Sequence, residues 1–249
     1  MKTANFTFHG ALNFFLPRRR KNKTIPFEFD WNGSIKDMVE AIAPPHPEIE
    51  LMVVNGQSVG WDYIVQDNDT VDAYPDYESV ELAEKIRLIP PYQGRPKFVL
   101  DTHLGRLAAY LRMMGFDTLY RNDYEDDELA EVSQAENRIL LTRDVGVLKR
   151  GIVTYGYFVR NTNPQKRLHE ISQRYGLAEQ IEAFARCMKC NGIVEPVEKA
   201  EIIDQIPEDT ASYYNEFQRC QSCGQIYWKG SHHQKMERLI DEVKNALLE

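Results

Sequence analysis

The sequence predicts an α/β protein in which a parallel sheet flanked by helices follows a small β-rich segment and precedes a cysteine-containing ribbon. Three observations support this prediction. Between residues 95 and 165, strand patterns alternate with helical patterns, as is typical of parallel sheets with crossover helices. Before residue 80, short alternating apolar runs flank one helical stretch. After residue 186, all four cysteines form two C-x-x-C pairs.

Length and composition limit the class of protein. The chain has 249 residues, 43% of them hydrophobic, which is enough to bury the cores of one large or two modest domains. Its net charge of −8 argues against coating nucleic acid through bulk positive charge, so such contact is expected to be local. No apolar run approaches the roughly 18 to 20 residues that cross a bilayer, and no secretory signal is evident. We expect a cytoplasmic protein without membrane contact.

Residues 1–85 have the element order of a β-grasp domain. Apolar residues alternate over Phe6–Leu16 and again over Ile25–Phe29, which predicts two strands joined by a hairpin. Ser34 is the expected cap of a helix that a Pro-Pro pair ends. Further strands are predicted at Leu51–Val54 and Val71–Tyr74. The order of two strands, one helix and further strands predicts the β-grasp fold.

The tip of the predicted hairpin is strongly basic. Five of the six residues in Arg18–Lys23 are cations. Such a run is either a solvated turn or a site that grips phosphates, and the sequence leaves both alternatives open.

The same segment resembles the ubiquitin-like sulfur-carrier proteins through its element order, Val53–Gly56 and the stretch Asp67–Tyr74. Those carriers end in a free Gly-Gly tail that is activated chemically, whereas this chain continues through Tyr74-Pro75-Asp76. The resemblance therefore implies a fold and not sulfur chemistry. It leaves recruitment of a protein partner as one role for the segment.

Residues 95–182 are expected to form the parallel sheet. The predicted strands are Lys97–Leu100, Thr118–Tyr120, Arg138–Leu141 and Tyr157–Val159. Helical spacing predicts a helix between the first two strands, which Gly115 ends. Further helices are expected after the acidic cluster 123–128 and after residue 144. Right-handed crossovers then place helices on both faces of the sheet.

Ligands bind to such sheets at the carboxyl ends of the strands. Charged and polar side chains follow the predicted strands at these ends. They are Asp101, Arg121, Asp123, Arg143, Asp144, Arg160 and Asn161. Carboxylates gathered on one rim repel each other unless a cation lies among them. Oxygen ligands suit magnesium or manganese, which can bind a phosphate and activate water. Alternatively, Asp101, Asp126 and Asp144 each cap a helix, and the spacing alone does not decide.

Residues 183–249 are expected to form a zinc ribbon and a C-terminal helix. Cys187 and Cys190 form one knuckle, and Cys220 and Cys223 form the other. Four thiolates complete a tetrahedral site with no open position, so the zinc would be structural. A redox role for the pairs is the weaker alternative. A helical insertion is expected at Lys199–Ile206.

Four runs in the middle segment resemble the PIN-like RNase family named for the Mut-seven C-terminal domain, a PIN fold with a fused zinc ribbon. They are Phe98–Asp101, Leu104–Leu107, Asp126–Leu129 and Ile139–Asp144, and Tyr227–His233 resembles the same family. The resemblance implies that Asp101, a carboxylate among Asp126, Asp127 and Glu128, and Asp144 hold the catalytic metal. Other PIN domains often offer a fourth carboxylate after the last strand, whereas here that strand runs into Arg160-Asn161-Thr162-Asn163. Because asparagine is a weak ligand, one or two metals remain open.

Candidate contacts to RNA are less specific. Arg106, Arg112 and Arg143 are candidate phosphate ligands, with ordinary surface charge as the alternative for some of them. Trp228 is a candidate for stacking on a base, although aromatic residues beside a knuckle also pack its small core. His232 or His233 could serve as a phosphate ligand or a proton donor; the alternative is that they lie exposed at a helix start that Ser231 caps.

The sequence therefore predicts a ribonuclease that uses magnesium or manganese to hydrolyse RNA, with tRNA or other structured RNA among the candidate substrates. One alternative is a non-catalytic RNA-binding adaptor whose β-grasp domain recruits a partner. Another is a toxin-like nuclease that the N-terminal domain covers. Cleavage of DNA, the mode of cleavage and the oligomeric state are left open.

Overall fold

A computed structural model describes residues 1–245; residues 246–249, the end of the predicted C-terminal helix, lie outside the described residues. The chain divides into two compact units. One comprises Met1–Tyr92 and Asp126–Phe158, and the other comprises Gln93–Glu125 and the chain from Val159 onward. Within the described residues, no helix has both the length and the apolar character needed to cross a bilayer.

The N-terminal segment of the first unit forms a five-stranded sheet. Its strands are β1 (Lys2–Phe8), β2 (Ile25–Phe29), β3 (Leu51–Val54), β4 (Gln57–Val59) and β5 (Thr70–Tyr74), in the order β2-β1-β5-β3-β4. β1 and β5 are parallel, and the other neighbours are antiparallel. The helix α1 (Ile35–Ile42) and the short η2 (His46–Glu48) follow β2. This is the predicted β-grasp arrangement.

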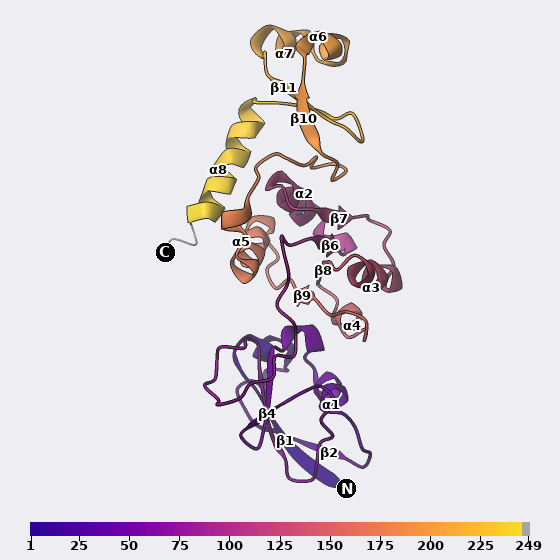
Figure 1. The fold of residues 1–249 in the computed structure, drawn as a ribbon, viewed down its shortest axis with the longest axis vertical. Coiled ribbons are helices and arrows are strands. Elements are labelled where there is room, and N and C mark those ends of the chain that lie inside the picture. Colours follow the sequence, from indigo (N-terminus) through magenta and orange to yellow (C-terminus); the bar gives the residue numbers. More distant parts are fainter. Residues whose placement is uncertain (246–249) are drawn as a thin grey trace. The chain divides into compact units, whose positions relative to one another are not determined.

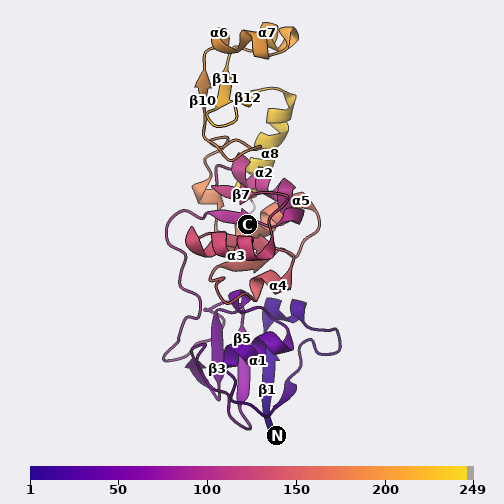
Figure 2. The same ribbon diagram turned by 90° about the vertical axis from the view of Figure 1, so that its right-hand side faces the viewer.

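The core of this sheet follows from sequence periodicity. Alternate residues of β1 are buried because successive strand side chains point to opposite faces. In α1 the buried residues recur at helical spacing, and Figure 2 shows this helix lying against the sheet. Ser34 caps α1 as predicted, since its side chain accepts from the Asp37 N–H in a capping box. The two buried faces share one apolar core.

The first predicted strand is wrong in its second half. The structure ends β1 at Phe8 and places a 3₁₀ helix, η1 (Gly10–Phe15), over the residues expected to continue the strand. Gly10 adopts a φ of +52°, which turns the chain out of the sheet. The buried Asn13 side chain then donates to the Phe8 carbonyl at 2.6 Å and stabilises the turn.

The four predicted strands of the middle segment form a parallel sheet. They are β6 (Phe98–Leu100), β7 (Thr118–Tyr120), β8 (Ile139–Thr142) and β9 (Gly156–Phe158). β6 pairs with β7 in the second unit, and β8 pairs with β9 in the first, both in parallel. All residues of β6 and β8 are buried, as expected for strands covered on both faces.

Helices flank each pair of strands. In the second unit, the short η3 (Thr102–Leu104), α2 (Gly105–Met113) and α5 (Pro164–Tyr175) accompany β6 and β7, and α2 contacts both β7 and α5. In the first unit, α3 (Asp126–Ala135) and α4 (Val145–Leu148) both contact β8. Figure 1 labels α2, α3, α4 and α5. Gly115, at a φ of +87°, follows α2 where the sequence predicts its end.

The C-terminal segment forms a small antiparallel sheet with a long final helix. Its strands are β10 (Val194–Val197), β11 (Phe217–Cys220) and β12 (Ile226–Trp228), in that order. The predicted helical insertion is present as α6 (Lys199–Ile202) and η5 (Ile203–Gln205), and α7 (Glu208–Tyr213) extends it. A short η4 (Ala178–Gln180) precedes the sheet, and α8 (Ser231–Asn245) follows it.

Candidate metal centre and nuclease site

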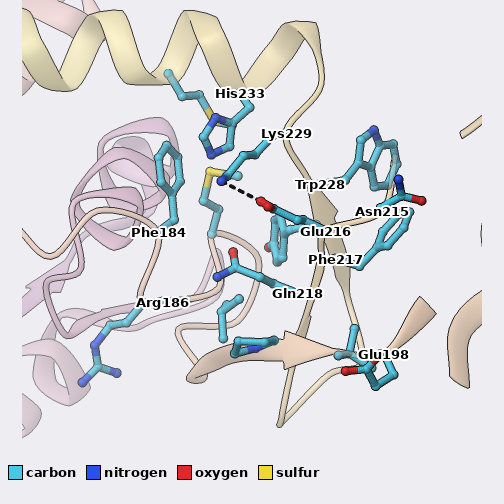
Figure 3. Close-up of a pocket in the computed structure, with 16 residues that line it drawn as sticks. Phe184, Arg186, Glu198, Asn215, Glu216, Phe217, Gln218, Trp228, Lys229 and His233 are labelled. Atoms are coloured by element: carbon cyan, nitrogen blue, oxygen red, sulfur yellow. Dashed lines mark hydrogen bonds and ion pairs between the residues drawn. The ribbon is translucent and has the colours of Figure 1, made fainter. Parts of the chain in front are cut away.

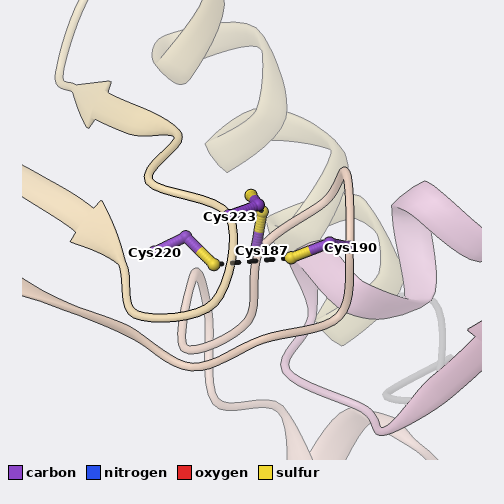
Figure 4. Close-up of side chains that lie close together, drawn as sticks. All are labelled: Cys187, Cys190, Cys220 and Cys223. Carbon is purple, nitrogen blue, oxygen red and sulfur yellow. Dashed lines mark hydrogen bonds between the residues drawn. The ribbon is translucent and has the colours of Figure 1, made fainter.

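The four cysteines converge as the spacing of the two knuckles predicts. Their sulfur atoms all lie within 4.8 Å of one another, and Figure 4 shows the four side chains drawn together from two separate turns. The Cys187 and Cys223 sulfurs are 3.6 Å apart, and those of Cys190 and Cys220 are 3.5 Å apart. A tetrahedral zinc site with Zn–S bonds of about 2.3 Å requires sulfur separations of about 3.8 Å. The four cysteines can therefore hold one zinc ion.

The electrostatics of the cluster favour a cation. Burial and hydrogen bonds with the other thiols raise the pKa of Cys190 to about 12. Burial also acts to raise the pKa of Cys187, but hydrogen bonds from the Tyr227 hydroxyl and the backbone lower it to about 7. Thiols this close cannot all carry charge without a compensating ion. A bound zinc ion would supply that compensation.

Arg112 links the first knuckle to the nuclease-like segment. Its guanidinium is buried and donates from Nε to the Thr118 carbonyl at 2.9 Å. Its Nη1 donates to the carbonyls of Met188 and Lys189 at 3.2 and 3.1 Å. Burial lowers the pKa of Arg112 below its ordinary value. The sequence makes Arg112 a candidate phosphate contact, whereas in the structure its side chain donates hydrogen bonds to three backbone carbonyls.

Asp101 directly follows β6, where the sheet offers a ligand site. Asp101 is buried, with 9% of its surface exposed, and its carboxylate accepts a hydrogen bond from the Thr102 hydroxyl at 3.1 Å. Its side chain does not cap the helical turn that follows, so the capping alternative is wrong for this residue. The Tyr120 hydroxyl fixes the same turn by donating to the Thr102 carbonyl at 2.9 Å. Gly105 permits this approach, because a Cβ there would lie 2.7 Å from that hydroxyl oxygen.

Asp126 and Asp127 form the exposed first turn of α3, where negative charge is favourable. Arg150, which the sequence analysis did not single out, contacts both. It forms an ion pair with Asp127, and its Nη2 lies 4.0 Å from the Asp126 carboxylate. Arg150 therefore partly neutralises this cluster. Only the three-dimensional fold brings it within reach, 23 residues away in sequence.

Asp144 has the capping role that the sequence left open. It precedes α4, and its Oδ1 accepts from the Gly146 N–H at 2.6 Å, while Thr142 Oγ1 accepts from the Asp144 N–H. The carboxylate nonetheless remains exposed at the end of β8. The neighbouring Arg143 lies with its guanidinium carbon 5.9 Å from the centre of the Phe158 ring.

Glu170 is a second residue that the sequence analysis missed. Its carboxylate accepts from the backbone N–H groups of Arg160 and Asn161 at 2.7 and 2.9 Å, and from the Asn161 side chain at 2.7 Å. A carboxylate from α5 is thus held against the two residues Arg160 and Asn161, which follow β9. A glutamate on an amphipathic helix gives no sequence signal for this contact.

The remaining candidate RNA contacts are accessible. Arg106 is exposed on α2, and His232 is exposed near the start of α8. Trp228 is 36% exposed and lines a cavity of about 350 Å³ between the ribbon sheet and α8. Figure 3 shows Phe184 and His233 facing each other on one side of this cavity, with Trp228 on the other. The Phe184 and His233 rings stack with centroids 4.2 Å apart.

The parallel sheet with carboxylates after its strands, the four-cysteine ribbon and the β-grasp domain define a nuclease-like α/β protein with two attached modules. Comparison with protein-family models agrees with this assignment. The Mut7-C RNAse domain matches residues 96–240, and the Mut7-C ubiquitin domain matches residues 1–81. The chain belongs to the Mut7-C RNAse domain family. No curated protein and no solved structure matches it.

Proposed function

We propose that this protein is a divalent-metal-dependent ribonuclease. The observation that supports the proposal best is the family match over residues 96–240, which contain Asp101 after β6 and Asp144 after β8. In the proposed site Asp101, Asp144 and a carboxylate from Asp126 or Asp127 hold the metal. Carboxylate oxygens are ligands that suit magnesium and manganese.

The chemistry follows from the residue types. A bound magnesium or manganese ion would supply a Lewis acid at the scissile phosphate and a water molecule of lowered pKa. Arg143 would hold a phosphate oxygen beside this site. Asp144 would keep its bond to the Gly146 N–H, which fixes the position of the carboxylate. We assign RNA as the substrate because the matched family is described as an RNase domain.

The ribbon has a structural role in this proposal. Zinc held by the four cysteines would fix both knuckles, while Arg106, Trp228 and His232 contact RNA. We propose three functional domains. They are the β-grasp domain at residues 1–85, the nuclease domain at residues 95–182, and the zinc ribbon with the C-terminal helix at residues 183–249.

Cleavage of labelled single-stranded RNA, tRNA and DNA with and without manganese tests the proposal. The decisive variant is Asp101→Asn with Asp144→Asn. Asparagine caps helices as well as aspartate does, so the substitution removes charge at residue 144 and keeps the α4 cap. The matched control is Asp62→Asn with Asp209→Asn, which removes two exposed carboxylates elsewhere.

We expect RNA cleavage to require the metal, to be lost in the Asp101 and Asp144 double variant and to persist in the control. Metal-dependent cleavage that is unchanged in the double variant would refute the assigned site. RNA binding without cleavage by the zinc-loaded wild type would favour the adaptor alternative.

A further inference from the structure

The β-grasp domain is fixed to the last strand pair of the sheet by buried polar contacts within one compact unit. The Glu48 carboxylate accepts from the Phe158 N–H in β9 at 2.7 Å. The buried His46 ring lies between two acceptors, with Nδ1 2.6 Å from Glu40 Oε1 and Nε2 2.8 Å from the Val153 carbonyl. Lys149 donates to the Glu40 carbonyl. Three of these contacts join the β-grasp domain to residues 149–158, which argues against a domain connected only by a flexible linker.

Aromatic contacts place a second part of the β-grasp domain at the carboxyl end of β9. The rings of Phe14 and Phe15, in η1, have centroids 5.3 and 5.6 Å from that of Phe158. Arg143 lies over the same Phe158 ring. Phe158 therefore contacts both η1 and the arginine that directly precedes Asp144.

The basic run begins three residues after Phe15. Three residues span at most about 10 Å, so Arg18 lies close to this aromatic contact. The Asn22 N–H donates to the buried Asn13 Oδ1 at 2.6 Å, which closes the base of the loop. Figure 2 shows the β1–β2 connection as an indigo loop that projects from the domain. The loop is thus anchored at the end of β9 rather than at a remote edge.

The cations of this loop are available for a ligand. Arg18, Arg19, Arg20, Lys21 and Lys23 are all exposed. In the described part of the chain none of them has an ion-pair partner, although the protein carries 38 acidic residues. In an acidic protein, a cluster of unpaired cations is a local site for a polyanion.

We propose that residues 18–23 bind the phosphate backbone of RNA and extend the substrate path from Arg143 and Asp144 onto the β-grasp domain. The inference rests on the proposed nuclease function, which makes RNA rather than an acidic protein the fitting polyanion. The β-grasp domain then acts as a substrate-gripping part of the nuclease.

The test measures binding of a labelled single-stranded RNA 20-mer by fluorescence anisotropy over a range of salt concentrations, without added magnesium or manganese. The loop variant replaces Arg18, Arg19 and Arg20 with Gln. The control replaces Lys235, Arg238 and Lys244 with Gln, which removes the same charge from exposed positions on α8. Circular dichroism establishes that both variants are folded.

Each phosphate contact to a single strand contributes about 0.7 to the slope of log K against log salt. The loop variant should therefore lose about 2 from the slope and about 100-fold in affinity near 0.1 M salt. The control should lose clearly less. Equal losses in the two variants, or no loss in the loop variant, would overturn the inference; binding of an acidic protein to the loop, with RNA binding unchanged, would overturn it too.

Cleavage separates this inference from the proposed function. If the nuclease proposal holds, the loop variant should lower kcat/KM for the 20-mer and leave that for a trinucleotide unchanged. If wild-type protein cleaves neither RNA but the loop variant still loses binding, the nuclease proposal fails and the RNA-binding loop stands. If the wild type cleaves and the loop variant handles both substrates normally, only the loop inference fails.

Discussion

Replacement of Arg112 by Met should destabilise the join between α2 and the first zinc knuckle. The substitution keeps an apolar stem in a buried position but removes the donors to three backbone carbonyls, at 2.9, 3.1 and 3.2 Å. The bond to the Thr118 carbonyl is buried, and a buried acceptor that loses its donor costs about 1 to 3 kcal/mol. The bonds to the Met188 and Lys189 carbonyls are partly buried and contribute about 0.5 to 1 kcal/mol each. The expected loss in the free energy of unfolding is therefore about 2 to 5 kcal/mol.

Two measurements test this expectation. Urea unfolding followed by circular dichroism gives the change in stability, and a chelating dye reports the rate of zinc release. Zinc release should accelerate, because the carbonyls of Met188 and Lys189 lie within the knuckle. Arg106→Met is the matched control on the same helix, since Arg106 is exposed, and it should change stability by less than about 0.5 kcal/mol. A loss below about 1 kcal/mol in Arg112→Met, with zinc release unchanged, would refute the reasoning.

Three further predictions follow from single contacts. Cys190→Ser should abolish stoichiometric zinc binding, because one thiolate of four is lost; elemental analysis measures the metal content, and a full zinc equivalent in the variant would contradict the site. Glu48→Ala should lower the free energy of unfolding by about 2 kcal/mol, since the Phe158 N–H loses its acceptor, and Glu48→Gln should lower it less; urea unfolding that ranks them the other way would argue against this contact. Asp144→Ala should cost about 1 kcal/mol through the lost cap, whereas Asp144→Asn should be nearly neutral; equal thermal shifts would show that the cap contributes little.

The sequence was sufficient where local patterns determine structure. The two C-x-x-C pairs predicted the cluster, because short knuckles bring their thiolates together in any ribbon. Ser34 and Gly115 marked the helix boundaries through their capping chemistry. The alternating run after Phe8 gave a wrong prediction of a strand. Over so few residues, a 3₁₀ helix with buried Leu12 and Asn13 shows the same apolar spacing as a strand.

Long-range contacts were beyond the sequence. Arg112 is of a residue type that commonly binds phosphate, and only its burial beside backbone carbonyls reveals its structural role. The ion pair of Arg150 with Asp127 and the bonds from Glu170 to the segment after β9 join residues on different elements. The contact between Glu48 and Phe158 spans 110 residues, so no local pattern could predict that the β-grasp domain docks on β9.

The most direct test of the central claim is the rate of RNA cleavage as a function of manganese concentration, in protein whose ribbon is already loaded with zinc. We predict that wild-type protein is inactive without manganese, that the rate rises to saturation as manganese is added, and that Asp101→Asn with Asp144→Asn abolishes this response. Cleavage at the same rate with and without manganese would contradict a metal-dependent site at these carboxylates.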